Sequence, residues 1–541
     1  MQCVFCHNDS STSNSVYNII KMCEKKENIE ELNNRICGYS FINVISYFAL
    51  TEQFYSKELL SYDEKLFIIG LWLKNINGKH IQGFETHEDV EAEAKVIYDL
   101  LEGLHISYMF DPASIDNAHS TTEFHNSKFE TPYSIQESIF YCGDGAYDLQ
   151  YTSLIADKYG NDSDWILQNK GVDIYKFHKF YIAIKQILIR KLEDFRNDLE
   201  NNNYSSDYDI SFPFIIDIAE IGSIDCDYLK IIDLFSFDIK NPPEVNINGI
   251  EDFNPLVEYP LIKISETQLY IPYCNIVANS LYELPFFWIV KDKKYYEQQG
   301  KHNRGDAAET LTKKLLERIF TQSSVFKNVN IYIGKKTCTE IDVLVKHEDI
   351  AIIFQVKSKR LSLESRKGNK EKIADDFKNA IGEAYEQAVA SESSMKDTNA
   401  ILKDKNGIIS ISGVKNTLKI GVTLDFFPAV DIITCSGLGK VPFISMSIFD
   451  LDMLTRCLNA EQFVDYLSYR LQYRGLSANS EATYLGFYLK HNGFGVIDNN
   501  LRVCDNVYLG EDNTPLIDKI MNMYLVKEYL PDLYEQIIQN N

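Results

Sequence analysis

The sequence has no long apolar run. No uninterrupted stretch approaches the roughly 18 apolar residues that a bilayer-spanning helix requires. The N-terminal residues MQCVFCHNDS also lack the basic and apolar regions of a signal peptide. We therefore expect no membrane segment and a cytoplasmic location.

An excess of positive charge is also missing, because the 541 residues carry a formal net charge of −24. An acidic surface repels a phosphate backbone, which argues against a protein that coats nucleic acid nonspecifically. The charge is unevenly distributed. Between Lys301 and Lys378 there are 17 Lys and Arg against 11 Asp and Glu, a net charge of +6 that leaves −30 for the remainder. This basic segment is either a solvated face or a surface that meets a polyanion.

A glycine-rich phosphate loop of the GxxxxGK[ST] type is absent, because the GLGK stretch at residues 437–440 lacks the required spacing. ATP-driven translocation by this chain is therefore not expected. Internal repeats and long low-complexity tracts are absent as well. The 45% apolar composition is typical of a globular protein of two to four domains with a large core.

The 11 cysteines are scattered and do not form a disulfide framework, so we expect reduced thiols. The N-terminal CVFC motif, Cys3 and Cys6, has the spacing of half a zinc site. Cys23 and Cys37 are the candidates for the other half, with His7 as an alternative ligand. The second pair has 13 intervening residues and is not a CxxC. A structural zinc site and ordinary core cysteines both remain open.

The chain divides by composition into three ranges. Residues 1–295 read as mainly helical, with a strand pair near 257–272 where β-branched and aromatic residues flank a polar turn. Residues 296–430 alternate between helical and strand patterns, and residues 431–541 read as amphipathic helices. We expect an α/β protein with a mainly helical α+β N-terminal region and a helical C-terminal region.

The middle range predicts helix, three strands, helix and strand in that order. Asn303 or Asp306 is a candidate cap for the first helix. Glu309 lies seven residues before Leu316 and eleven before Phe320, so it shares their apolar face at helical spacing. A buried acid is costly unless a partner compensates it, which marks Glu309 as a candidate functional residue.

Polar residues also interrupt two of the predicted strands. Gln355 and Lys357 are two residues apart and therefore point to the same face of one strand. The turn KHED pairs this strand with its predecessor, which carries Asp342. Two carboxylates, an amide and an ammonium group can meet at this place, and such oxygen ligands suit Mg²⁺. Asp342, Gln355, Glu309 and the carbonyl of Val356 are the candidate metal ligands, with Lys357 orienting water or stabilising charge.

These motifs resemble the PD-(D/E)xK nuclease superfamily and its Mrr-like restriction-endonuclease branch, in which glutamine replaces the acid before the lysine. The matching residues are Gly305-x-x-x-Glu309, then Glu340-Ile341-Asp342, then Gln355-Val356-Lys357. The resemblance covers about 130 of the 541 residues. It implies an αβββαβ restriction-endonuclease-like core with a mixed sheet flanked by helices, and Mg²⁺- or Mn²⁺-dependent cleavage that uses Glu309, Asp342, Gln355 and Lys357.

A basic stretch follows these motifs and is a candidate contact for a phosphate backbone, although a solvated loop has the same composition. Its residues are Lys359, Arg360, Arg366, Lys367 and Lys370. In the next predicted helix, polar residues of the kind that family members carry there are secondary candidates: Lys378, Tyr385 and Gln387.

We therefore expect an Mg²⁺-dependent endonuclease that acts on nucleic acid, with DNA favoured over RNA by the resemblance. Defence against phage or foreign DNA is the role that this branch suggests. The acidic flanking ranges suggest a homodimer or a protein partner. Two alternatives stay open: an RNA nuclease acting as a toxin-like effector, and a catalytically inactive nucleic-acid-binding scaffold.

Overall fold

A computed structural model represents the chain. It describes residues 25–55, 58–78, 86–109, 132–141, 145–201, 209–427, 441–472, 476–478, 480–494 and 507–540. The chain splits into two compact units, of which the first comprises residues 1–143 and 183–280 and the second residues 144–182 and 281–541. The division differs from the three sequence ranges, because residues 144–182 group with the second half of the chain.

The first unit combines helices with a small four-stranded sheet of order β1-β4-β3-β2. Its helices are α2 (Lys25–Arg35), α3 (Ile42–Tyr55), α4 (Tyr62–Lys74), α5 (His87–Met109), α8 (Pro132–Tyr141), α13 (Ile218–Ile224) and α14 (Tyr228–Phe235). Its strands are β1 (Ile215–Asp217), β2 (Ser236–Asp238), β3 (Leu261–Lys263) and β4 (Gln268–Tyr270). Strands β3 and β4 are antiparallel neighbours within residues 257–272, where the sequence predicts a strand pair.

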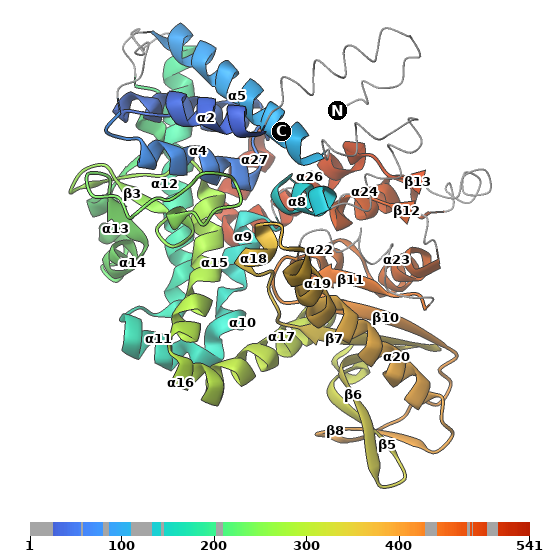
Figure 1. The fold of residues 1–541 in the computed structure, drawn as a ribbon. Helices are drawn as coiled ribbons and strands as arrows, with labels where there is room; N and C mark the ends of the chain where they lie inside the picture. The colour runs from blue at the N-terminus through green and yellow to red at the C-terminus, as the bar shows by residue number, and fades with distance from the viewer. Residues whose placement is uncertain are drawn as a thin grey trace, which may run out of the picture. The chain divides into compact units, whose positions relative to one another are not determined.

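The second unit contains a larger sheet with helices around it (Figure 1). Its strands are β5 (Val325–Ile333), β6 (Lys336–His347), β7 (Ile350–Lys357), β8 (Ala400–Asp404), β9 (Gly407–Ile409), β10 (Asn416–Thr423) and β11 (Ile444–Ser447), with a separate pair of β12 (Leu476–Ser477) and β13 (Val507–Tyr508). Its helices before the sheet are α9 (Asp148–Ser153), α10 (Ile155–Tyr159), α11 (Ser163–Lys170), α16 (Lys293–Tyr295) and α17 (Lys301–Leu316). Later helices are α18 (Leu363–Arg366), α19 (Lys370–Phe377), α20 (Glu383–Met395), α22 (Ile448–Cys457), α23 (Ala460–Gln472), α24 (Glu481–His491), α26 (Thr514–Tyr529) and α27 (Pro531–Asn540). Helices α12 (Phe177–Glu200) and α15 (Cys274–Lys291) continue from one unit into the other.

The seven strands are ordered β11-β10-β7-β6-β5-β8-β9. Strands β5, β6 and β7 are antiparallel neighbours, whereas β10 is parallel to β7 and β11 is parallel to β10. The β6–β7 hairpin closes at the predicted KHED turn, where Glu348 has a φ of 51°. A mixed helix and sheet protein, as the sequence predicts, is confirmed at this level. The β8–β9 hairpin and strand β11 are additions that the sequence patterns did not predict.

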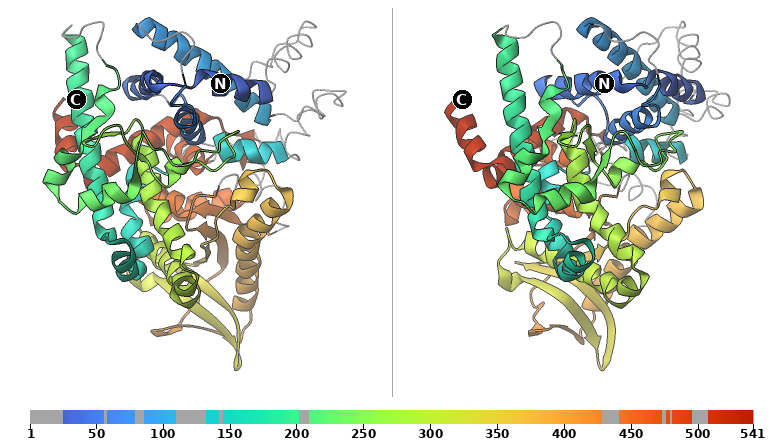
Figure 2. Two further views of the ribbon diagram at one scale, coloured as in Figure 1. Left: turned by 60° about the vertical axis from the view of Figure 1, so that its left-hand side comes forward. Right: turned by 90° about the vertical axis from the view of Figure 1, so that its left-hand side faces the viewer.

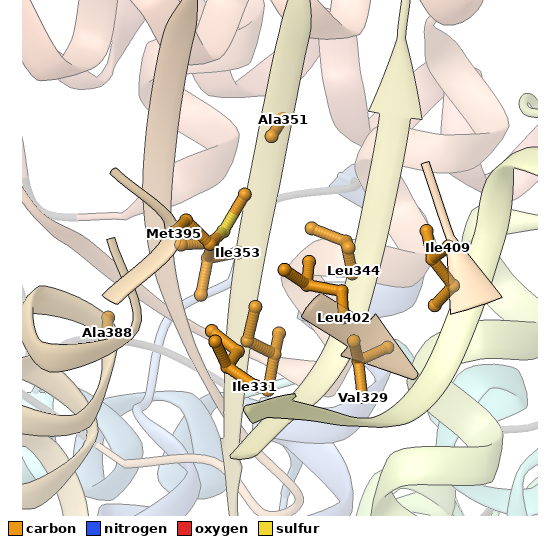
Figure 3. Packing of buried hydrophobic residues seen from close by; sticks show 10 residues of the cluster. Val329, Ile331, Leu344, Ala351, Ile353, Ala388, Met395, Leu402 and Ile409 are labelled. Carbon is orange, nitrogen blue, oxygen red and sulfur yellow. The ribbon is translucent and has the colours of Figure 1, made fainter. Parts of the chain in front are cut away.

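The sheet is buried on both faces. Ile353 of β7 packs in an apolar cluster with Ala388 and Met395 of α20 (Figure 3). Helix α20 contacts β5, β6, β7 and β10 and runs beside the sheet in Figures 1 and 2. Ile352 and Phe354 alternate to the other face and are also fully buried. Helix α17 contacts β5, β6 and β7. Side chains from both α17 and α20 therefore lie near the central strands of the sheet.

The start of α17 differs from the sequence expectation. Asn303 and Asp306 lie inside this helix rather than at its cap, because a π-helical turn, Tyr296–Gly300, joins α16 directly to α17. The cap of this continuous segment is Asp292, whose side chain accepts a hydrogen bond from the backbone N–H of Tyr295. A second π-helical turn, Lys378–Gly382, joins α19 to α20. Both helices beside the sheet thus begin after a π turn, a local irregularity that is frequent at functional sites.

No helix within the described parts of the chain combines the length and apolarity needed to cross a membrane.

Candidate active site

Asp342 lies at a break in the sheet. The ladder between β5 and β6 pairs the residues on either side of Asp342 but omits Asp342 and Asn328, which faces it. Asn328 has a φ of 56°, in the left-handed region that few residues other than glycine adopt. The ladder between β6 and β7 ends at the pair Val343 and Phe354, before it reaches Asp342. Within these three fully described strands, Asp342 therefore has no ladder partner.

The side chain of Asp342 connects β6 and β7 beyond the end of their backbone ladder. Its Oδ2 accepts a hydrogen bond from the backbone N–H of Val356 at 2.6 Å. The carboxylate thus connects β6 to the end of β7 beyond the last backbone pair. This contact orients the Asp342 carboxylate toward the end of the strand that carries the glutamine and lysine of the motif.

Gln355 and Lys357 both contact α20, as expected for residues on one face of β7. The Nε2 of Gln355 donates to the carbonyl of Glu340 at 3.0 Å and to Oγ of Ser391 at 3.4 Å. Gln355 is fully buried, and its Oε1 has no hydrogen-bond partner. The Nζ of Lys357 donates to Oε1 of Gln387 at 2.7 Å. Gln387, a secondary candidate from the sequence, is therefore brought to the lysine.

Glu309 reaches the same neighbourhood from α17. Its Oε2 lies 3.6 Å from Nζ of Lys327 on β5. Lys327 also donates to Oδ1 of Asp306 at 2.6 Å and to Oγ1 of Thr310 at 2.7 Å. Sequence reasoning missed Lys327. The signal that would have identified Lys327 is its position in β5. The alternation of side chains along the strand directs Lys327 toward the acids of α17.

Both carboxylates have raised pKa values. Burial, and then the charge of Asp342, raise the pKa of Glu309 to about 7, although the cation of Lys327 opposes this shift. Burial raises the pKa of Asp342 to about 6, against the opposing effects of the Val356 N–H and the charge of Lys357. Titrating carboxylates with raised pKa values beside a cation are typical of functional sites.

These raised pKa values predict the pH dependence of stability in the absence of metal. The folded state holds the proton of Glu309 more tightly than the unfolded chain, where the pKa is near 4.5. The stability that protonation contributes is present below this value and is lost as the pH rises through about 7. Glu309→Gln removes this loss of stability. The free energy of unfolding of the variant minus that of wild type should therefore increase by about 1–2 kcal/mol between about pH 5 and pH 8.

Urea unfolding of both proteins in EDTA measures this difference. Glu317→Gln provides the matched control, since Glu317 lies further along the same helical segment in an ion pair with Lys313 at 3.1 Å. If the free energies of unfolding of Glu309→Gln and wild type differ by the same amount at every pH, the pKa of Glu309 is not raised in the folded state.

The oxygen atoms of this site suit a hard divalent cation. Asp342 and Glu309 supply carboxylates, and Gln355 supplies a buried amide oxygen that lacks a donor. Such an acceptor is satisfied equally well by a metal ion or by water, and Mg²⁺ selects oxygen ligands of this kind. Among the described residues, no group of three or more His, Cys, Asp or Glu side chains can hold a metal ion.

The five basic candidates have different surroundings. Lys367 and Lys370 are exposed, Arg366 is half-buried, and Lys359 is exposed with Nζ 3.4 Å from Asp376. Arg360 instead turns inward, where its guanidinium pairs with Glu283 and lies over the rings of Phe286 and Phe287. Because its guanidinium is engaged by Glu283, the structure does not bring Arg360 together with the exposed lysines.

The remaining candidates are only partly connected to the site. Lys378 is exposed on the π-helical turn before α20. The ring of Tyr385 packs edge-on against Phe443, with centroids 5.6 Å apart. The proposed zinc ligands Cys3, Cys6 and Cys23 lie outside the described residues, whereas Cys37 is buried and its Sγ donates to the carbonyl of Asn34 at 3.5 Å.

Comparison with known proteins identifies no relative. No protein-family model matches the chain, and searches of curated proteins and of solved structures also find no match.

Proposed function

We propose that this chain is a metal-dependent nuclease that hydrolyses phosphodiester bonds. The main support is the break in the sheet, where Asp342 bonds the end of β7 beside Gln355 and Lys357 while Glu309 approaches from α17. The order of α17, three antiparallel strands, α20 and parallel β10 is consistent with the αβββαβ core that the sequence resemblance implies. The QxK form of the PD-(D/E)xK motif supports the same assignment.

Mg²⁺ or Mn²⁺ would be held by Asp342 and Glu309, with the Gln355 amide oxygen and the Val356 carbonyl as further ligands. When bound, such an ion supplies charge neutralisation and lowers the pKa of water. Both carboxylates must be ionised to bind it. Their raised pKa values therefore predict that binding releases protons and weakens as the pH falls below about 7.

The side chains of the protein supply orientation. Asp342 is held by the Val356 N–H, and Gln355 is held through its Nε2 by Glu340 and Ser391. Lys357 orients the attacking water or stabilises the negative charge that develops on the phosphate. Its hydrogen bond to Gln387 limits the positions that the ammonium group can take.

DNA is the proposed substrate, and defence against phage or foreign DNA is the proposed role. Both come from the family resemblance. The net charge of −24 opposes unguided binding to a polyanion. A homodimer or a protein partner is therefore proposed to deliver the substrate to the basic segment.

A cleavage assay tests the proposal and separates its alternatives. Labelled duplex DNA, single-stranded DNA and RNA are each incubated with the protein and Mg²⁺ or Mn²⁺. Cleavage of DNA that EDTA abolishes is the expected result. Preferential cleavage of RNA would instead identify an RNA nuclease. Nucleic-acid binding that survives EDTA without any product would identify an inactive scaffold, for which Gln355 in the place of an acid is the favouring observation.

Binding to DNA is expected to depend on salt through the exposed lysines. The double variant Lys367→Ala/Lys370→Ala should reduce the slope of log affinity against log salt by about 1–2, because each lost phosphate contact releases one counterion fewer. Fluorescence anisotropy in EDTA, with salt varied, measures this slope. Lys403→Ala/Lys405→Ala, at the exposed β8–β9 turn, is the matched control. Equal slopes for both double variants would remove Lys367 and Lys370 from the interface.

A further inference from the structure

Five charged side chains, three of them buried and two half-buried, meet in the second unit, close to the C-terminal ends of β7 and β10. They come from separate segments of the chain: Lys158 on α10, Glu283 on α15, Arg304 on α17, Arg360 after β7 and Asp425 after β10. The side chain of Lys158 is completely buried, and those of Asp425 and Arg304 are 4% and 7% exposed. Nothing in the local sequence pattern marked this group, which we call the Asp425 cluster.

Asp425 is the centre of the cluster. Its Oδ1 accepts from Nζ of Lys158 at 2.7 Å, and its Oδ2 pairs with the guanidinium of Arg304. Arg360 Nε lies 4.0 Å from the same oxygen. Glu283 adds a second acid, which pairs with Arg360 and lies 3.7 Å from Lys158 Nζ.

The cluster holds three cations against two anions, and only Arg360 and Glu283 are partly exposed to water, with side chains 25% and 14% exposed. Aromatic faces compensate part of this imbalance, since Lys158 Nζ lies 3.4 Å from the ring centroid of Tyr282 and Arg304 lies 4.1 Å from that of Phe286. Burial lowers the pKa of Lys158 to about 8, which leaves it charged at neutral pH. One use of charges buried at this cost, known from some proteins, is to specify a geometry.

The geometry that this cluster specifies is the end of the lysine-bearing strand. Arg304 Nε donates to the carbonyl of Ser358, the residue after Lys357, at 3.1 Å. The backbone N–H of Leu424, next to Asp425, donates to the carbonyl of Lys357 at 2.9 Å. Arg304 also lies on α17, five residues before Glu309. The carbonyl of Ser358 is thus bonded directly to the helix that carries Glu309, and the carbonyl of Lys357 is linked to it through Leu424 and Asp425.

We propose that Arg304 and Asp425 are positioning residues that hold the backbone of Lys357 in register with Glu309. This inference rests on the proposed nuclease function for its catalytic consequence, although the positioning itself is a property of the fold. Lys158 and Glu283 lie outside residues 296–430, so the segment that resembles a nuclease depends on the rest of the second unit for this support.

Two variants of the 541-residue chain test the proposal without changing the net charge of the cluster. Arg304→Lys keeps the cation but removes the Nε donor to Ser358. Asp425→Asn/Lys158→Met keeps the net charge of the cluster but removes the carboxylate that pairs with Arg304. The matched control is Asp452→Asn, because Asp452 is 1% exposed, pairs with Arg318 and Arg456, and belongs to the same unit.

Two measurements are made on each variant, with activity expressed per folded molecule. For both cluster variants kcat should fall about tenfold or more while KM stays within about twofold, because a misplaced lysine impairs the chemical step more than binding. Hydrogen exchange of the Leu424 N–H, which reports on its bond to the Lys357 carbonyl, should accelerate in both. Asp452→Asn should change neither value.

The two measurements distinguish a failure of the nuclease proposal from a failure of the positioning proposal. If wild type cleaves no substrate, the nuclease proposal fails, and hydrogen exchange at Leu424 alone decides the positioning proposal. If exchange at Leu424 in the cluster variants matches wild type, or if Asp452→Asn changes exchange and kcat to the same extent, the positioning proposal is overturned.

Discussion

Alanine in place of Asp342 or Lys357 is expected to lower the rate of phosphodiester cleavage by about 10²-fold or more. Lys357→Ala removes the cation at the end of β7, and loss of one preorganised charge-stabilising group typically costs about 10²–10³-fold in kcat. Asp342→Ala removes a metal ligand together with the acceptor of the Val356 N–H, so it disturbs both the ion and the end of the strand. Single-turnover cleavage with saturating protein measures the chemical step.

An acid and a lysine on the surface near the same hairpin provide the control variants. Asp349 in the β6–β7 turn and Lys415 before β10 form an exposed ion pair at 3.2 Å, with side chains 42% and 76% exposed. Exposed pairs contribute little to stability, so Asp349→Ala and Lys415→Ala should retain wild-type cleavage. If Lys357→Ala cleaves as fast as these controls, the assignment of the site is wrong.

Asp425→Asn alone is expected to lower the free energy of unfolding by about 3–5 kcal/mol. The substitution leaves the buried Lys158 and Arg304 and the half-buried Arg360 with Glu283 as the remaining acid of the cluster. An uncompensated buried charge costs far more than the loss of a surface ion pair, because water does not screen it. Denaturant unfolding followed by tryptophan fluorescence and circular dichroism measures the loss.

Adding Lys158→Met to Asp425→Asn should recover part of this loss, because it removes one of the unpaired cations. Asp349→Asn serves as the surface control and should stay within about 0.5 kcal/mol of wild type. An effect of Asp425→Asn as small as that of Asp349→Asn would show that the cluster is not buried as described.

Local patterns in the sequence were sufficient for the central hairpin. The β-branched runs on either side of KHED predict two paired strands, and β6 and β7 pair in this way. The two-residue spacing of Gln355 and Lys357 predicts a shared face, and both side chains contact α20. Strand periodicity is a short-range property, which is why it can be read from a few consecutive residues.

The same local reasoning failed where an element continues beyond its pattern. Asn303 and Asp306 look like caps because they precede an apolar periodicity, but the helix already begins before them through the π-helical turn. Their side chains have long-range partners instead. Asn303 donates to Oδ1 of Asp162 at 2.7 Å, and Asp306 accepts from Lys327. Neither partner adjoins its residue in the sequence.

The residues of the proposed site were predicted from the sequence, because an acid, an amide and a lysine lie on adjacent predicted strands. The contacts that these residues make arise only on folding. The break in the ladder at Asp342, the hydrogen bond between Lys357 and Gln387 and the inward turn of Arg360 all depend on which segments pack together. The Asp425 cluster is the extreme case, because it joins residues as far apart as Lys158 and Asp425. Periodicity reports on neighbours along the chain, whereas a buried ion cluster depends on desolvation and on partners that only the folded core brings together.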